Sequence, residues 1–243
     1  MKRILSLLLV SIFVFISPLQ VQAATVKPYY EIFSMIRGTS GSYYVYDIPL
    51  MWNNKSTNGT LQLKINYSEY VSSTQSVLRG VIASNYAAWD KSGYTSASLA
   101  GTANATVHFV YPTTTYWKNM FGGNEGDIAG TLLYDSKGTL IQSASAAYQS
   151  TKLINRANIV FNPNKTHSNN MNTKKSLIHE LGHVLCLGHP IDKSCFPQEY
   201  HMYTEEMTNI TSIMHQGLAS QYNYIPDLPS QYDYNAIKTK YGY

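Results

Sequence analysis

The sequence contains few charged residues and almost no cysteine. Only 13% of its 243 residues are charged, and its two cysteines are Cys186 and Cys195. Two cysteines exclude a small fold held together by a disulfide framework. The 21 tyrosines and the 44% hydrophobic content exclude a disordered chain, because such chains lack aromatic residues. We therefore expect a globular protein of one or two domains, with a weakly charged surface that suits the outside of a cell.

The longest apolar run is too short to cross a membrane. Residues 4–16 follow two basic residues, Lys2 and Arg3, whereas a bilayer span needs about 20 apolar residues. The sequence "VQA" at 21–23 offers the small residues that a signal peptidase reads. We predict a signal peptide at 1–23 and a secreted, extracellular protein. Its removal lowers the formal net charge from +4 to +2, with 16 basic and 14 acidic residues left, which excludes a nucleic-acid-binding charge pattern.

The remaining chain divides by its patterning. Residues 24–58 are rich in turn-forming residues, and we expect an N-terminal segment or a short propeptide there. Residues 59–243 are regular and predict one folded domain. Leu61, Leu63 and Ile65 alternate as in a half-buried strand. Further strands are expected at 105–111, on both sides of a turn at 135–138, and at 157–163. Helices are expected within 72–93, 172–185 and 230–243, with a long loop at 122–130. This order predicts an α/β (α+β) sandwich on one twisted, mixed sheet.

The sequence predicts core-facing residues for the first two helices and capping residues for the second and third. Those of the first helix are Val77, Val81, Ile82, Ala88 and Trp89, before a stop at Gly93. Those of the second are Leu177, Leu181, Val184 and Leu185, with Asn172 or Thr173 as the cap. Ser230 and Asp233 resemble a capping box at the start of the last helix.

The sequence "HELGHVLCLGH" at 179–189 concentrates three histidines and one glutamate. His179 and His183 lie four apart on a helix and can direct their imidazoles at one metal ion, at roughly 2.0–2.1 Å for zinc. Glu180 projects near the same point and can deprotonate a zinc-bound water without being a ligand. His189 can return as the third ligand if the chain turns after Leu185, and three imidazoles leave the fourth position that a catalytic zinc needs.

These residues resemble the metzincin metallopeptidases, whose pattern is H-E-x-x-H-x-x-G-x-x-H followed by a methionine-containing turn. His179, Glu180, His183 and His189 match this pattern, and "SIMH" with Met214 resembles the Met-turn. The first predicted strands and helix and the closing helix are similar to the matrixin branch, so the resemblance covers about residues 60–242. It implies one catalytic Zn²⁺, with Met214 as a structural, apolar layer beneath it.

The sequence departs from the family at three positions. Cys186 replaces the glycine of the pattern, so we expect the turn to shift toward Gly188. Pro190 after the third histidine is serralysin-like, and Gln216 stands where the astacin turn has a tyrosine that reaches the metal. The metzincin subfamily therefore stays open.

Other residues offer alternatives for metal binding. His201, His215, Glu199, Glu205 and Glu206 are rivals for the third zinc ligand, and the family spacing favours His189 over all of them. His108 and His167 are expected to have no special role, although such histidines bind a second, structural zinc in some matrixin-like folds. A structural Ca²⁺ at Glu125 and Asp127 is weakly supported, because calcium prefers six to eight oxygen ligands. Secretion makes a disulfide between Cys186 and Cys195 the expected state of the two thiols. The main alternative is a buried, free Cys186 in the place of the family glycine with an exposed Cys195, and a zinc-bound thiolate is disfavoured because it would occupy the position of the water.

The function predicted from these residues is a secreted zinc metalloendopeptidase, a hydrolase that cleaves peptide bonds of extracellular proteins through a zinc-bound water and Glu180. Its partners are protein or peptide substrates, bound extended along an edge strand in the 129–148 region, and a monomer is expected. The alternative is a non-catalytic secreted binding protein that retains a zinc-protease fold. The intact Glu180 argues against that alternative.

Overall fold

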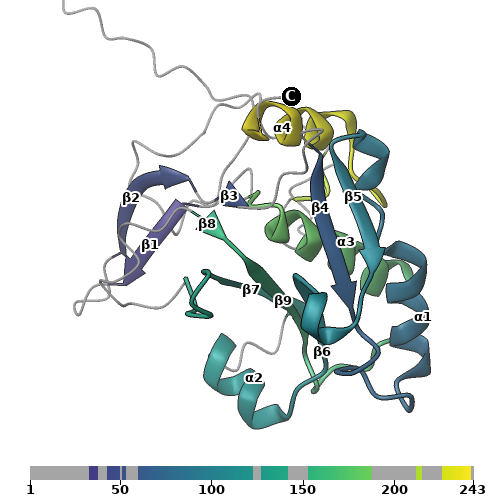
Figure 1. Cartoon of the computed structure of the whole chain (residues 1–243). Helices are drawn as coiled ribbons and strands as arrows, with labels where there is room; N and C mark the ends of the chain where they lie inside the picture. Colours follow the sequence, from purple (N-terminus) through teal and green to yellow (C-terminus); the bar gives the residue numbers. More distant parts are fainter. Residues whose placement is uncertain are drawn as a thin grey trace, which may run out of the picture.

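A five-stranded mixed sheet forms the centre of the computed structural model (Figure 1). Its strand order is β5-β4-β6-β9-β7; β7 runs antiparallel to β9, and the other pairs are parallel. The structure describes residues 33–37, 43–49, 51–52, 60–122, 127–141, 153–187, 212–214 and 226–241, so the predicted signal peptide at 1–23 lies outside them. The strands are β4 (Leu61–Asn66), β5 (Thr95–Leu99), β6 (Val107–Val110), β7 (Ala129–Tyr134) and β9 (Arg156–Phe161). The predicted mixed α/β architecture is confirmed.

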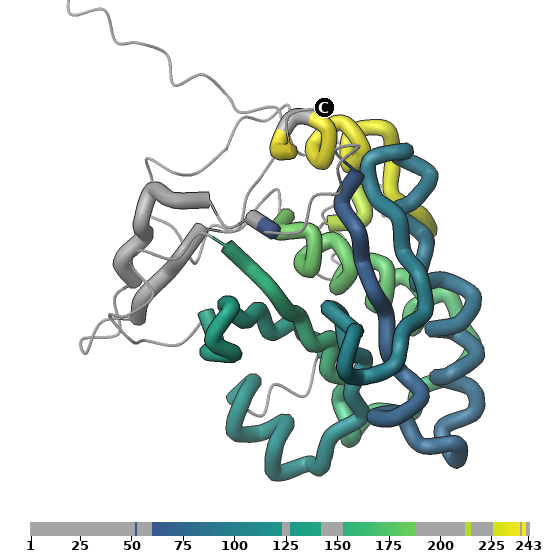
Figure 2. Tube along the Cα trace, in the orientation of Figure 1, coloured from purple at the N-terminus to yellow at the C-terminus, as the bar shows by residue number. Residues whose placement is uncertain are grey.

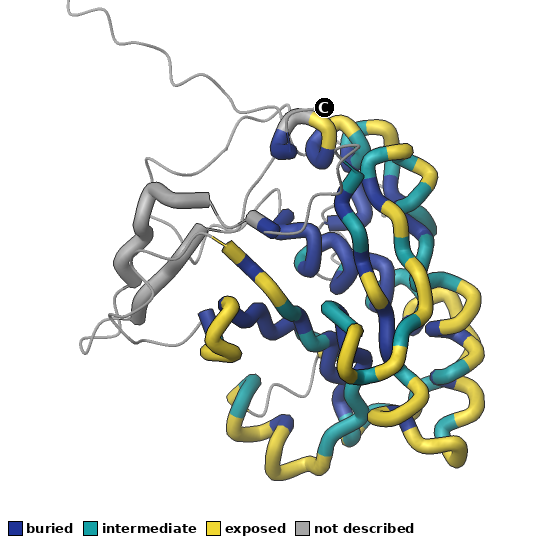
Figure 3. The backbone as a smooth tube through the Cα atoms, viewed as in Figure 1, coloured by how far each residue is buried: buried dark blue, intermediate teal, exposed yellow. Residues whose placement is uncertain are grey.

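Helices pack on both faces of this sheet. On one face, α1 (Ser76–Asn85), α3 (Met171–Val184) and α4 (Gln231–Tyr241) share one hydrophobic core with inward residues of β4, β6 and β9. On the other face, Trp117 of α2 (Thr114–Phe121) packs against Leu132, Tyr134 and Val160. Figure 3 shows α3 buried along much of its length, whereas α1 exposes its outer side. The helix with the histidines is therefore the innermost of the three.

Smaller elements complete the described chain. β1 (Phe33–Arg37) and β2 (Tyr43–Pro49) form an antiparallel hairpin, and β3 (Met51–Trp52) pairs in parallel with β8 (Leu153–Ile154). Short 3-10 helices follow α1 and β5, at Asp90–Ser92 and Thr102–Asn104.

Several elements agree with the sequence patterns. Leu61, Leu63 and Ile65 are buried as expected of the first strand, and so are the four residues of the apolar stripe on α3. The capping box of α4 is confirmed, because the Ser230 amide donates to Asp233 Oδ2 (2.7 Å) and the Asp233 amide donates to Ser230 Oγ (3.3 Å). These patterns are local, so they could be read without the tertiary structure.

Four expectations were wrong. The side chain of Val77 is 46% exposed, because α1 turns Leu78 inward instead. The cap of α3 is Asn170, whose side chain accepts from the Thr173 amide at 2.9 Å, not Asn172 or Thr173. The expected loop at 122–130 ends earlier, since β7 begins at Ala129. Beyond Gly138, Leu140 makes only an isolated bridge to Tyr134 where a second strand was expected, and residues 142–150 lie outside the described part. The patterns also missed β5 and α2.

Trp52 joins the N-terminal segment to the core. It is 3% exposed and belongs to the same core cluster as α3. Its indole N–H donates to the Val184 carbonyl, near the C-terminal end of α3. The division of the chain at residue 59 stays a prediction, and Trp52 is a contact of the 24–58 segment that any chain beginning at residue 59 would lose.

We expect Trp52→Ala to destabilise the fold by about 3–5 kcal/mol, the usual cost of truncating a buried aromatic side chain. Trp52→Phe keeps most of the buried volume and should cost about 1–3 kcal/mol, because it leaves the Val184 carbonyl without this donor. Urea unfolding of the purified protein measures both values. Val77→Ala, at an exposed position of α1, is the control and should change stability by less than about 0.5 kcal/mol. A loss below about 1 kcal/mol in Trp52→Ala would contradict the burial of this side chain.

Candidate metal centre

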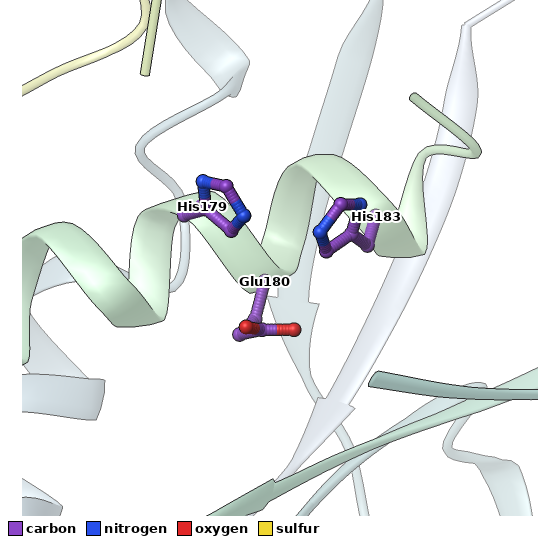
Figure 4. Close-up of side chains that lie close together, drawn as sticks. All are labelled: His179, Glu180 and His183. Carbon is purple, nitrogen blue, oxygen red and sulfur yellow. The ribbon is translucent and has the colours of Figure 1, made fainter. Parts of the chain in front are cut away.

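The three polar residues of the "HELGH" sequence converge on one side of α3. His179, Glu180 and His183 each offer a ligand atom, and these atoms lie within 4.8 Å of one another. The two imidazole rings stand nearly perpendicular, with centroids 4.7 Å apart. Figure 4 shows the two rings one helical turn apart and Glu180 between them along the helix. Among the described residues, this is the only group of three or more His, Cys, Asp or Glu side chains close enough to hold one metal ion.

Both histidine rings are oriented by hydrogen bonds to backbone carbonyls. His179 Nδ1 lies 2.8 Å from the Ile213 carbonyl, and His183 Nδ1 lies 2.8 Å from the Leu187 carbonyl. A carbonyl oxygen can only accept, so each neutral ring carries its proton on Nδ1 and its lone pair on Nε2. Metal-ligating histidines use this arrangement, in which the second nitrogen fixes the tautomer and the direction of the ring. Two fixed lone pairs at this spacing suit a metal ion.

Glu180 is a buried carboxylate beside the two rings. It is 8% exposed, and Thr131 Oγ1 donates a hydrogen bond of 2.7 Å to its Oε2. Burial raises the pKa of Glu180 to about 7; the Thr131 hydrogen bond opposes this shift, and the negative charge of Asp127 adds to it. A carboxyl group whose pKa lies near neutrality can both accept and donate a proton at physiological pH.

The end of α3 is a Schellman motif centred on Cys186. The Cys186 amide donates to the His183 carbonyl (2.8 Å) and the Leu187 amide donates to the Gly182 carbonyl (3.0 Å). Cys186 has a φ of +62°, in the left-handed region that favours glycine. The expected shift of this turn toward Gly188 was therefore wrong, because Cys186 adopts the conformation of the glycine that it replaces.

The predicted Met-turn residue packs directly under α3. Met214 is fully buried, and a Cβ atom added at Gly182 would lie 2.1 Å from its Sδ and 2.8 Å from the indole of Trp89. Any larger residue at position 182 would therefore push Met214 or Trp89 away from the helix. The absence of a side chain at Gly182 lets Met214 reach the backbone between the two histidines.

Asp233 holds the segment at 212–214 in place, a role that sequence reasoning missed. Ser212 Oγ donates to Asp233 Oδ1 (2.6 Å) and the Ile213 amide donates to Asp233 Oδ2 (3.1 Å). The carbonyl of the same Ile213 accepts from His179, so the fully buried Asp233 is two hydrogen bonds away from a ligand ring. The sequence identified Asp233 only as a capping residue, because the contact crosses 20 residues of chain.

Many of the candidate site residues predicted from the sequence lie outside the described part of the chain. They are Glu125, Gly188, His189, Pro190, Cys195, Glu199, His201, Glu205, Glu206, His215 and Gln216. The third ligand and the disulfide of Cys186 with Cys195 therefore stay predictions; a thiol titration of the unfolded, unreduced protein tests the disulfide. Among the described residues, His108 and His167 join no metal-binding group, and burial lowers the pKa of both imidazoles.

The left-handed turn predicts an unusual order of stability at position 186. Cys186→Gly should be more stable than Cys186→Ala by about 1 kcal/mol, because a residue with a Cβ pays about 1–2 kcal/mol in this conformation. Both variants lose the same thiol, so the comparison is independent of its redox state. Urea unfolding gives the difference. In the control position Ala236, within α4, glycine should instead lower stability by about 1 kcal/mol. Equal stabilities of the two Cys186 variants would contradict the turn.

No protein-family model and no curated protein matches the chain. Among solved structures, it is similar to high choriolytic enzyme 1, a hatching-enzyme zinc protease from Oryzias latipes (medaka fish), with 14% identity over 79% of this chain and 94% of that chain and a TM-score of 0.41. Two structures of myroilysin match with 13% identity over 80% of this chain and 98% of that chain (TM-score 0.39), and with 14% over 79% and 87% (TM-score 0.41). The group of His179, Glu180 and His183 fits the metzincin resemblance, whereas the matrixin branch stays a prediction.

Proposed function

We propose that the protein is a secreted zinc-dependent endopeptidase. The observation that carries this proposal is the pair of backbone hydrogen bonds at the histidines, which fix both Nε2 lone pairs near a buried carboxylate. Nitrogen ligands of this kind suit zinc, and two imidazoles one turn apart fit its preferred geometry. A helix that was rich in histidine by chance would not need both rings fixed in the same tautomer.

Three histidines would hold the zinc ion. His179 and His183 are in place on α3, and His189 completes the set by its spacing in the sequence. When bound, zinc lowers the pKa of a coordinated water toward neutrality and polarises the scissile carbonyl of the substrate. The helix ends at Val184, and the Schellman turn is centred on Cys186, three positions before His189, which supports a return of the chain toward the metal.

Glu180 would move the proton. Its carboxylate lies within 4.8 Å of the two ligand nitrogens, so it can take a proton from the attacking water and deliver it to the leaving amine of the peptide. Both transfers need the same group to accept and to donate. Because α3 is buried between the sheet and the neighbouring helices, this carboxylate is largely shielded from bulk solvent.

An extended substrate would pair with β7. This strand is at the edge of the sheet and contacts α3. The Leu133 carbonyl accepts from the Ile141 amide (2.8 Å), so the backbone of Leu133 points away from β9. Along an antiparallel strand, the backbone N–H and C=O groups of successive residues point alternately to the two neighbouring positions. The backbone groups of Thr131 and Ala129 are therefore expected to point to the outer edge, as those of Leu133 do. Among the described residues, no strand pairs with this edge at 129–132, and we propose that an extended peptide pairs there by β-augmentation.

A non-catalytic binding protein is the competing function. A buried carboxylate costs stability unless it is compensated, and within the described part of the chain only one hydrogen bond reaches a Glu180 side-chain oxygen. A binding protein with no catalytic activity would gain stability if an uncharged residue replaced Glu180. Cleavage of casein or gelatin with and without a chelator separates the two functions.

Secretion belongs to the same proposal. The signal-peptide pattern at 1–23 supports it. In the described part of the chain, no helix combines the length and the hydropathy that a membrane span needs. N-terminal sequencing of protein from culture medium should begin at or after Ala24, and a retained Met1 would contradict secretion.

We expect a chelator to abolish peptidase activity and added zinc to restore it. Glu180→Ala should keep one zinc ion per chain and lose about 10²–10⁴-fold in kcat, because it removes the proton-transfer group and none of the ligands. Metal analysis and a casein assay on the same samples measure both effects. Turnover at the wild-type rate in Glu180→Ala would disprove the mechanism.

Removing the third ligand should affect metal binding selectively. His189→Ala is expected to lower zinc occupancy by about 10-fold or more at limiting zinc, because two imidazoles alone make an incomplete site. His201→Ala and His215→Ala are the controls, and both should bind zinc as the wild type does. Full occupancy in His189→Ala together with a loss in either control would assign the third ligand to a downstream histidine.

A further inference from the structure

Thr131 lies between the substrate edge and the glutamate. It is the third residue of β7, and its side chain is 7% exposed on the face of the sheet that packs against α3. Its hydroxyl lies 2.7 Å from Glu180 Oε2 and 3.1 Å from the Glu180 carbonyl oxygen. Both atoms belong to Glu180 of α3, which is 49 positions away from Thr131 in the sequence.

The hydroxyl proton goes to the carboxylate. A threonine hydroxyl has a single proton and can donate one full hydrogen bond. The distance to Oε2 is the shorter one, and hydrogen bonds to a charged oxygen are both shorter and stronger than those to a neutral carbonyl. Thr131 therefore fixes Oε2, and the second carboxylate oxygen remains for proton transfer.

This bond sets the orientation of the carboxylate. A glutamate side chain has several rotatable bonds, and restricting them costs up to about 2 kcal/mol of conformational entropy. With Oε2 held from β7 and the Cα held in α3, the side chain is fixed at both ends before any substrate binds. A displacement of a reacting group by about 1 Å can cost about 10²-fold in rate.

The same residue also faces the proposed substrate. By the alternation along β7, the backbone of Thr131 is expected to point away from β9, while its side chain reaches Glu180. A peptide that paired with this edge would therefore be placed relative to the residue that orients the base. The distance between the substrate and the carboxylate would then depend on one residue rather than on several loops.

We propose that Thr131 is a positioning residue that holds the Glu180 carboxylate in its working orientation through its hydroxyl. This inference rests on the proposed peptidase function. It assigns Thr131 no contact with the reacting atoms, and it makes the hydroxyl, not the methyl group, the part that matters.

The test compares three substitutions in the full-length secreted protein loaded with zinc, assayed on a fluorogenic derivative of casein. Thr131→Val has the same shape and no hydroxyl, and kcat should fall about 10–100-fold with KM changed by less than about 3-fold. Thr131→Ser restores the hydroxyl and should recover kcat to within about 3-fold of the wild type. Zinc content should be unchanged in every variant.

Thr95→Val is the matched control. Thr95 is also a buried threonine on an edge strand, and its hydroxyl donates to the Asp90 carboxylate at 3.0 Å. The substitution removes the same kind of bond at the opposite edge of the sheet, so it should leave kcat unchanged. If Thr131→Val fails to fold by circular dichroism, Thr131→Ala replaces it in the comparison with Thr131→Ser.

Each result decides the question. Wild-type kcat in Thr131→Val, a kcat in Thr131→Ser as low as in Thr131→Val, an effect on KM alone, or an equal loss in Thr95→Val would each overturn the positioning role. A wild-type protein that cleaves nothing, or that cleaves equally well with a chelator, would instead refute the peptidase function, and the role of Thr131 would fall with it.

Discussion

The hydrogen bond between His179 and the Ile213 carbonyl connects the parts of the structure on which the metal centre depends. On one side it fixes the tautomer and the direction of the His179 ring, a candidate metal ligand on α3. On the other side, the amide of Ile213 is held by Asp233, which lies in the first turn of α4. Met214, the next residue, packs against Gly182 of α3. The segment at 212–214 therefore packs against α3 and orients the ring of His179 at the same time.

Helix α3 is held in place by aromatic hydrogen-bond donors from three distant parts of the chain. Trp89 donates to the Ile178 carbonyl at 2.9 Å, Tyr241 donates to the Leu185 carbonyl at 3.0 Å, and Trp52 donates to the Val184 carbonyl. The Val184 and Leu185 carbonyls lie at the C-terminal end of α3, where backbone carbonyls have no partner within the helix, so buried donors must satisfy them. The bond from Trp89 instead reaches the middle of the helix. In Figure 2 the yellow α4 lies above the green α3. The bonds from Trp52 and Tyr241 fix the C-terminal end of α3, and the bond from Trp89 fixes its middle.

The local features of the fold could be predicted from sequence, whereas contacts between distant residues could not. The spacing of His179 and His183 follows from the period of a helix, and the capping box of Ser230 and Asp233 from local hydrogen bonds. The bond from Thr131 to Glu180 has no sequence signature, because strand pairing alone brings β7 beside α3. Cys186 was misjudged for a different reason. Its residue type disfavours the left-handed conformation, and the two backbone hydrogen bonds and the burial of the turn outweigh that preference.

Two features near the C-terminal end of α3 each cost stability: the left-handed backbone of Cys186 and the buried carboxylate of Glu180. Cys186 holds a conformation that costs about 1–2 kcal/mol for a residue with a side chain, and Glu180 is a carboxylate whose burial opposes its charged form. Both occur within seven residues of the same helix end, next to the two oriented imidazoles. The fold tolerates this loss of stability because α3 is the most buried of its helices and accepts hydrogen bonds from Trp52, Trp89 and Tyr241. The stability of the surrounding sheet and helices thus maintains a local arrangement that is unfavourable by itself, with a buried carboxylate beside two oriented imidazoles.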